Sequence, residues 1–202
     1  MKQAAKNTLS SLSGFPVHDA MKGLATGNRV GKPAEREQEV LTPQCIVDVC
    51  NKVWGQIALD PCWCEGSLTN PIHKFEFPAV DALTSSWVAY SYINCPYKDL
   101  KKWLAYGRTQ PSEQIWLCPV RTHRTWWRQW RDNLDVYCEL NPLKFVGYDC
   151  AFPAPLLLGY RGTSISEFME AAQKLGSVYA SSEYSKDRDR DVSWSSGRRT
   201  GY

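Results

Sequence analysis

Residues 88–106 read VAYSYINCPYKDLKKWLAY and combine three patterns in one short stretch. The first six residues are apolar and β-prone, which predicts a strand from Val88 to Ile93. The last nine, Lys98 to Tyr106, have the apolar spacing of an amphipathic helix. The tetrad Asn94-Cys95-Pro96-Tyr97 therefore follows the carboxyl end of a predicted strand, and in open α/β sheets ligands bind at that edge.

Helices and strands alternate along the first half of the chain. Thr42 is a predicted N-cap and Pro43 a predicted first helical residue, for a helix that ends at Gly55. Other predicted helices cover 98–106, 122–130 and 166–175, and predicted strands cover 56–59, 88–93, 114–119, 136–138, 143–146 and 156–160. The last two strands are expected to form a hairpin. This order predicts an α/β fold with a mostly parallel sheet and a terminal antiparallel hairpin.

A chain of 202 residues is long enough for one domain with a real core plus flexible ends. Residues 39–162 contain the alternating elements and are predicted to form that domain. Residues 1–38 lack sustained periodicity and are predicted to be a flexible arm with a short helix at 19–24. Residues 163–202 are predicted to form a C-terminal helix and, from residue 181, a disordered charged tail.

The composition is that of a soluble globular protein, with 43% hydrophobic and 22% charged residues. No apolar run reaches the length of a membrane span and no signal-peptide core is present. We therefore expect no membrane partner and a cytoplasmic location. The net charge is only +3, so any contact with nucleic acid has to come from local clusters of basic residues.

Eight cysteines are scattered through the predicted helices and strands. In a reducing compartment we expect free, mostly buried thiols. Cys62-Trp63-Cys64 has one intervening residue and lacks a second pair at zinc spacing, which argues against a metal site.

An ordered set of motifs extends from about residue 41 to residue 160. It consists of Thr42-Pro43, Leu59-Asp60-Pro61-Cys62, Asp81-Ala82-Leu83 with Trp87, Asn94-Cys95-Pro96-Tyr97, 116–122 (WLCPVRT) with Trp126-Trp127, 143–147 (LKFVG) and 154–158 (APLLL). In this order the set resembles the phage-type Dam-like DNA N6-adenine methyltransferases. The resemblance implies a Rossmann-like methyltransferase sheet, S-adenosyl-L-methionine as cofactor and double-stranded DNA as partner.

The same resemblance implies a set of cofactor-binding residues. Asp60 would lie near the methionine or ribose part of the cofactor, and Asp81 near its adenine. Thr42, Pro43 and Pro61 would border the same pocket. A carboxylate suits this place because it accepts hydrogen bonds and offsets positive charge. Taken alone, Asp60-Pro61 is also typical of an ordinary turn that ends a strand.

The tetrad at 94–97 is the predicted catalytic site. Extruding adenine from a duplex costs a few kcal/mol, and stacking on Tyr97 offsets part of this cost with about 1–3 kcal/mol. The Asn94 side-chain oxygen and the Cys95 backbone carbonyl would accept the two N6 hydrogens, while Pro96 shapes the turn. No covalent nucleophile or metal is needed, since positioning supplies the rate.

Cys95 stands where the family usually has proline. Pro96 still biases residue 95 toward an extended backbone, so we expect weakened preorganisation of Asn94. A catalytically inactive descendant is the alternative, as is an ordinary strand-exit turn with Tyr97 in the core.

Residues 121–131 are the predicted DNA-binding segment. On a helix, Arg121, Arg124 and Arg128 would share one face with Arg131 and contact phosphates. The alternative is an amphipathic helix whose tryptophans pack on the sheet, which we favour for Trp127 and Trp130.

Three other functions stay open to different degrees. Methylation of cytosine N4 uses the same amine chemistry. Methylation of cytosine C5 is disfavoured, because Pro61-Cys62 falls at the cofactor strand rather than at the base-binding turn. A nucleic-acid-binding or interaction protein that retains the fold without turnover belongs to a different class, and binding of S-adenosylmethionine would separate it from an enzyme.

Overall fold

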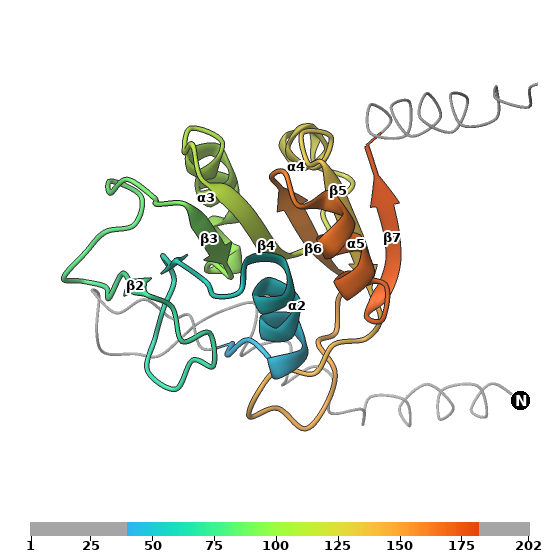
Figure 1. Ribbon diagram of the computed structural model, residues 1–202, viewed down its shortest axis with the longest axis horizontal. Coiled ribbons are helices and arrows are strands. Elements are labelled where there is room, and N and C mark those ends of the chain that lie inside the picture. Colours follow the sequence, from blue (N-terminus) through green and yellow to red (C-terminus); the bar gives the residue numbers. More distant parts are fainter. Residues whose placement is uncertain (1–39, 182–202) are drawn as a thin grey trace, which may run out of the picture. The chain divides into compact units, whose positions relative to one another are not determined.

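The computed structural model describes residues 40–181, which form a seven-stranded mixed sheet with helices on both faces (Figure 1). The arm expected at 1–38, its short helix and the tail expected after residue 181 lie outside the described residues. No helix within residues 40–181 is long and apolar enough to cross a membrane.

The strands are short, and most follow or precede a helix. They are β1 (Leu59–Asp60), β2 (His73–Lys74), β3 (Tyr90–Ile93), β4 (Glu113–Pro119), β5 (Val136–Leu140), β6 (Leu156–Arg161) and β7 (Gly176–Ala180). The helices are α2 (Gln44–Trp54), the 3-10 turn η1 (Tyr97–Asp99), α3 (Leu100–Gly107), α4 (Thr125–Arg131) and α5 (Ile165–Ala172).

The order of strands in the sheet is β2-β1-β3-β4-β6-β5-β7. The four strands β2, β1, β3 and β4 are parallel, whereas β6 is antiparallel to both of its neighbours and β7 is antiparallel to β5. The predicted α/β class is thus confirmed, with parallel pairing early in the chain and antiparallel pairing later.

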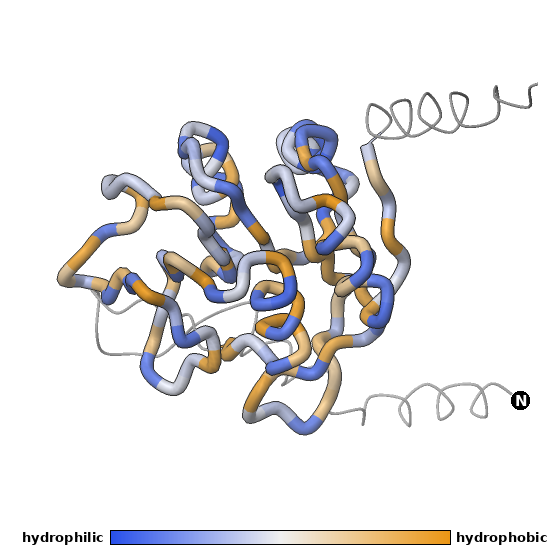
Figure 2. Tube along the Cα trace, viewed as in Figure 1, coloured by the Kyte–Doolittle hydropathy of each residue, from blue (hydrophilic) through white to orange (hydrophobic). Residues whose placement is uncertain are grey.

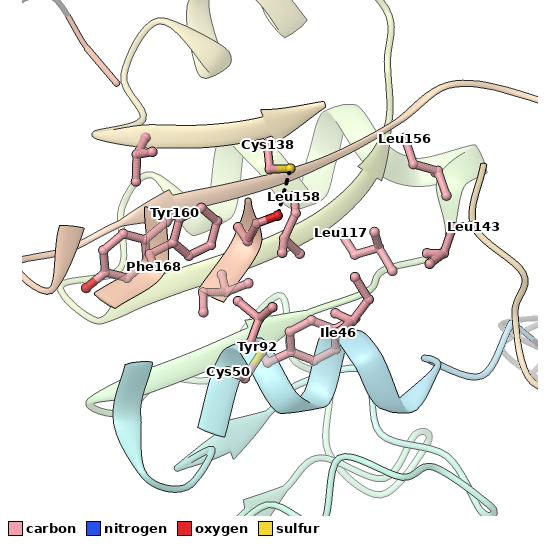
Figure 3. Packing of buried hydrophobic residues seen from close by; sticks show 14 of the residues in the cluster. Ile46, Cys50, Tyr92, Leu117, Cys138, Leu143, Leu156, Leu158, Tyr160 and Phe168 are labelled. Atoms are coloured by element: carbon pink, nitrogen blue, oxygen red, sulfur yellow. Dashed lines mark hydrogen bonds between the residues drawn. The ribbon is translucent and has the colours of Figure 1, made fainter. Parts of the chain in front are cut away.

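Two apolar clusters fix the helices on opposite faces of the sheet. On one face, α2 and α5 lie side by side (Figure 1), and Lys52 of α2 lies 3.8 Å from Glu170 of α5. Figure 3 shows Tyr92 of β3 close to Ile46 and Cys50 of α2 within this cluster. On the other face, α3 and α4 bury Trp103, Trp127 and Trp130 against β4. The prediction that Trp127 and Trp130 pack on the sheet is confirmed.

The predicted hairpin of 143–146 with 156–160 is wrong. Residues 143–146 form no strand, and only Val146 makes a single bridge, with Leu41. Leu143 and Phe145 are apolar because they enter the core from an irregular segment, where Phe145 packs edge-on against Phe152. β6 pairs instead with β4 and β5.

Thr42 does not cap α2. The N-cap is Pro43, and no side chain caps the first turn. The Thr42 hydroxyl points instead to Tyr92 and Asn94. Gly55 ends the helix as predicted, with φ of 75°.

Two strands are additional to the sequence prediction. β2 is a two-residue edge strand within 61–86, a segment expected to be irregular, and β7 follows α5. Residues 163–181, placed outside the methyltransferase-like domain by the sequence, therefore belong to the same sheet and core, because β7 pairs with β5 and α5 buries Phe168 and Ala172.

None of the eight cysteines forms a disulfide, and five of them are buried, as the sequence predicts.

Candidate functional site

The ends of β1 and β3 bring Asp60 and Asn94 to the same edge of the sheet. Both strands are parallel neighbours with Leu59 level with Ser91, so the residues that follow them emerge side by side. A pocket lies at this place, with about 220 Å³ of empty space that includes open solvent. Its walls are Val40, Leu41, Thr42, Asp60, Cys62, Cys64, Ser67 and Asn94.

The Asn94 side chain is held from both of its ends and is 5% exposed. Its Nδ2 donates to the Val40 carbonyl over 2.9 Å and to Thr42 Oγ1 over 3.2 Å. Its Oδ1 accepts a hydrogen bond from the Tyr97 hydroxyl over 3.1 Å. A carbonyl oxygen has two lone pairs, so Oδ1 retains capacity for one more donor.

Asp60 is 4% exposed and organises the loop that follows β1. Its Oδ1 accepts from the Cys62 backbone N–H over 2.9 Å, and its Oδ2 accepts from the Thr69 hydroxyl over 2.8 Å. Thr69 in turn lies 2.9 Å from the Ser67 hydroxyl. Asp60 thus forms the strand-ending turn and lines the pocket at the same time, and buried Pro61 is part of that turn.

Tyr97 lies partly buried at the start of η1, beside Asn94. Its ring packs edge-on against Phe152, with 5.7 Å between the ring centroids. Burial raises the pKa of Tyr97 well above its ordinary value, with further increases from the Cys118 and Cys95 thiols, while Arg121 acts in the opposite direction. The hydroxyl therefore stays protonated at neutral pH and acts as a donor to Asn94.

Cys95 and Pro96 form the turn that leaves β3. Both residues are buried, and the Cys95 side chain packs in the α3–α4 cluster rather than toward the pocket lining. Pro96 has φ of −55° and precedes η1, so it directs the chain from β3 into that turn.

Asp81 lies apart from the pocket lining. It is exposed, and its Oδ1 accepts from the Leu83 backbone N–H over 2.9 Å, which makes it the first residue of a turn. Its predicted contact with the cofactor stays a prediction.

The predicted arginine stripe is wrong as a helical face, because α4 begins only at Thr125. Arg121 lies in the preceding turn, Arg124 is the N-cap, and Arg128 and Arg131 lie within the helix. Arg128 donates to the Thr122 carbonyl over 2.6 Å and thereby joins the turn to the helix. Arg124 and Arg128 are exposed, and hydrophilic residues prevail along the outer turns of α3 and α4 (Figure 2).

Three polar residues near the pocket have no place in the sequence prediction. Ser67 and Thr69 come from a loop without periodicity, so no pattern marks them. Tyr92 has the burial pattern of a core strand residue, yet its hydroxyl lies 2.9 Å from Thr42 Oγ1. This hydrogen bond joins residues 50 positions apart, so it is visible only in the folded structure.

Within residues 40–181 no group of three or more His, Cys, Asp and Glu side chains is arranged to hold a metal ion. No protein-family model, curated protein or solved structure matches the chain.

Proposed function

We propose that this protein is an S-adenosylmethionine-dependent DNA methyltransferase that acts on the N6 amino group of adenine. One observation carries the proposal. Asp60 and Thr42, assigned to the cofactor from one set of motifs, line the same pocket as Asn94, assigned to the base from another. The carboxyl edge of parallel strands is also where open α/β sheets bind their ligands.

The polar groups that line the pocket complement those of the cofactor. Asp60 offers a carboxylate to amino or hydroxyl groups, and Ser67 and Thr42 offer hydroxyls. Ligand pockets usually measure about 300–1,000 Å³, whereas the cavity here measures only about 10 Å³. Entry of the whole cofactor therefore requires movement of the loop at 61–70.

When bound, S-adenosylmethionine supplies an electrophilic methyl group on sulfur. The task of the protein is to orient the amine. Asn94 Oδ1 accepts one N–H of the amino group, which raises the electron density on its nitrogen, and the Tyr97 ring supports the base. Such a site needs hydrogen-bond acceptors and a stacking ring rather than a charged side chain that acts as a general base.

Transfer of a tritiated methyl group into unmodified DNA tests the proposal. We expect incorporation by the wild type and its loss in Asn94→Ala and Tyr97→Ala. The matched controls are Asn51→Ala on the exposed side of α2 and Tyr179→Ala on β7, where Tyr179 is 45% exposed. Unchanged incorporation in both site variants would remove the assignment of this site.

Long-read sequencing of DNA from expressing cells identifies the modified base. Finding N4-methylcytosine in that DNA would mean that cytosine, not adenine, is the acceptor.

A second candidate is a nucleic-acid-binding protein that keeps the fold without turnover. The observation that favours it is the occupied acceptor: Tyr97 already bonds to Asn94 Oδ1, next to a cysteine where the family has proline. Calorimetry with S-adenosylmethionine separates the two candidates. Absence of binding supports the second, and binding without methyl transfer identifies an inactive site.

A further inference from the structure

We infer that Thr42 and Tyr92 are positioning residues that, together with the Val40 carbonyl, fix which way round the Asn94 amide lies. The inference rests on the proposed function and deepens it, because it names what makes Asn94 an acceptor rather than a donor. The connected atoms are the Tyr92 hydroxyl, Thr42 Oγ1 and Asn94 Nδ2, at 2.9 Å and 3.2 Å, with the Val40 oxygen 2.9 Å from Nδ2.

The Val40 carbonyl sets the direction. A backbone carbonyl only accepts hydrogen bonds, so the atom of Asn94 that faces it has to be the NH₂ group. Rotating the amide by half a turn would place Oδ1 against the Val40 oxygen, so that two acceptors would face each other and the hydrogen bond from Nδ2 would be lost. Buried polar groups without partners are costly, so the observed orientation is strongly preferred.

Thr42 accepts the second hydrogen of Nδ2. Its hydroxyl is 4% exposed and faces Tyr92, which has no exposed surface. Burial raises the pKa of Tyr92 well above its ordinary value, with the Cys50 thiol adding to this, while the bond to Thr42 opposes it. Tyr92 therefore keeps its proton at all physiological pH values, and the Thr42–Tyr92 pair remains complete.

With Nδ2 occupied on both hydrogens, Oδ1 is turned toward Tyr97 and the turn after β3. An acceptor in that place selects a ligand group that donates, such as an amine, over one that accepts, such as a carbonyl. The same contacts explain asparagine at position 94, because an aspartate would direct a carboxylate oxygen at the Val40 carbonyl.

The test compares Thr42→Val, which keeps the shape of the side chain without the hydroxyl, with Thr42→Ser, which keeps the hydroxyl. Tyr92→Phe removes the other hydroxyl. Two kinds of measurement are made on the full chain. The first gives kcat and KM for DNA and the Kd for S-adenosylmethionine. The second is the hydrogen-exchange rate of the Asn94 side-chain NH₂, measured by nuclear magnetic resonance.

We expect Thr42→Val and Tyr92→Phe to lower kcat by about tenfold, because small misplacements of a reacting group cost up to about a hundredfold. In Tyr92→Phe the Kd for the cofactor stays within about twofold of the wild type, and Thr42→Ser restores kcat. The Asn94 NH₂ exchanges at least about tenfold faster in Thr42→Val than in Thr42→Ser. Tyr92→Phe keeps its ring in the core and decides the matter should Thr42→Val not fold.

Equal exchange rates and equal kcat in the Val and Ser variants would overturn the inference, as would a Kd in Tyr92→Phe that weakens as much as kcat falls. If the wild type transfers no methyl group, the proposed function is wrong, but the inference about Asn94 is still tested by the exchange rates of its NH₂ group. Faster exchange in both Thr42→Val and Tyr92→Phe supports the positioning role in that event.

Discussion

The Tyr97 hydroxyl donates a hydrogen bond to Asn94 Oδ1 over 3.1 Å, so the stacking residue and the acceptor of the proposed base site are bonded to each other. The two residues are three positions apart and are joined across the turn that leaves β3. An incoming amine shares Oδ1 with the tyrosine or displaces its hydroxyl. In either case the ring and the hydroxyl of Tyr97 contribute separately to binding.

We predict that Tyr97→Phe and Tyr97→Ala differ widely. Phenylalanine keeps the ring and frees Oδ1, so kcat/KM for DNA should stay within about threefold of the wild type. Alanine removes the stacking surface, which contributes about 1–3 kcal/mol per base, so kcat/KM should fall by about 5–150-fold. Steady-state methyl incorporation measures both values. An equally severe loss in Tyr97→Phe would mean that the hydroxyl, not the ring, carries the role.

The exposed arginines at the start of α4 predict how DNA binding depends on salt. If Arg124→Ala removes one phosphate contact, the plot of the logarithm of the association constant for duplex DNA against the logarithm of the salt concentration should become less steep by about 0.9. The control is Lys52→Ala, because Lys52 is exposed on α2, on the opposite face of the sheet. Fluorescence anisotropy at several salt concentrations gives the slopes. Equal slopes for the two variants would place the DNA elsewhere.

The sequence predicted the elements with strong local patterns and missed those decided by distant contacts. The strands β3, β4 and β6 are almost wholly buried, so their apolar runs are long enough to recognise. β2 has only two exposed residues and β7 is half exposed, so neither has a clear pattern. Leu143, Lys144 and Phe145 alternate like a strand, although Leu143 and Phe145 enter the core from a loop.

The site was predictable to the extent that it depends on strand order. Asp60 and Asn94 each follow a predicted strand, and parallel pairing of these strands brings them together. The contacts of Thr42 with Tyr92 and Asn94 join residues at least 50 positions apart, and no local pattern encodes them. For the same reason Thr42 was predicted as a helix cap, its most common local role.

At Gly107 we expect an alanine to be destabilising for steric reasons, although alanine has the higher helix propensity. It is the last residue of α3, and a Cβ placed there would overlap the Trp116 ring and crowd Trp87. Alanine favours a helix over glycine by about 1 kcal/mol, yet overpacking a core costs about 1–3 kcal/mol. Gly107→Ala should therefore lower the free energy of unfolding, as measured by urea denaturation. A more stable variant would show that Trp116 can shift without cost.

Glu113 predicts a pH-dependent contribution to stability. Its carboxylate accepts hydrogen bonds from Trp54 Nε1 at 3.2 Å and the Tyr160 hydroxyl at 2.7 Å, and from the backbone and hydroxyl of Thr163. Burial raises the pKa of Glu113, but these hydrogen bonds outweigh burial, so its pKa lies below the ordinary 4.5. A carboxylate whose pKa is lowered on folding stabilises the fold above the unfolded pKa, and this stabilisation disappears as the pH falls through the folded pKa.

Glu113→Gln should therefore lower the free energy of unfolding by about 1–2 kcal/mol at pH 7, because both carboxylate oxygens accept hydrogen bonds whereas an amide has only one acceptor oxygen. The difference from the wild type should shrink as the pH falls through the lowered pKa of Glu113, where the wild-type carboxyl takes up a proton. Urea denaturation at pH 7 and at low pH measures it, with Glu139→Gln on the exposed side of β5 as the control. A difference that is constant with pH would show that the shape of the side chain, rather than its charge, holds α2, β4, β6 and the bend at Thr163 together.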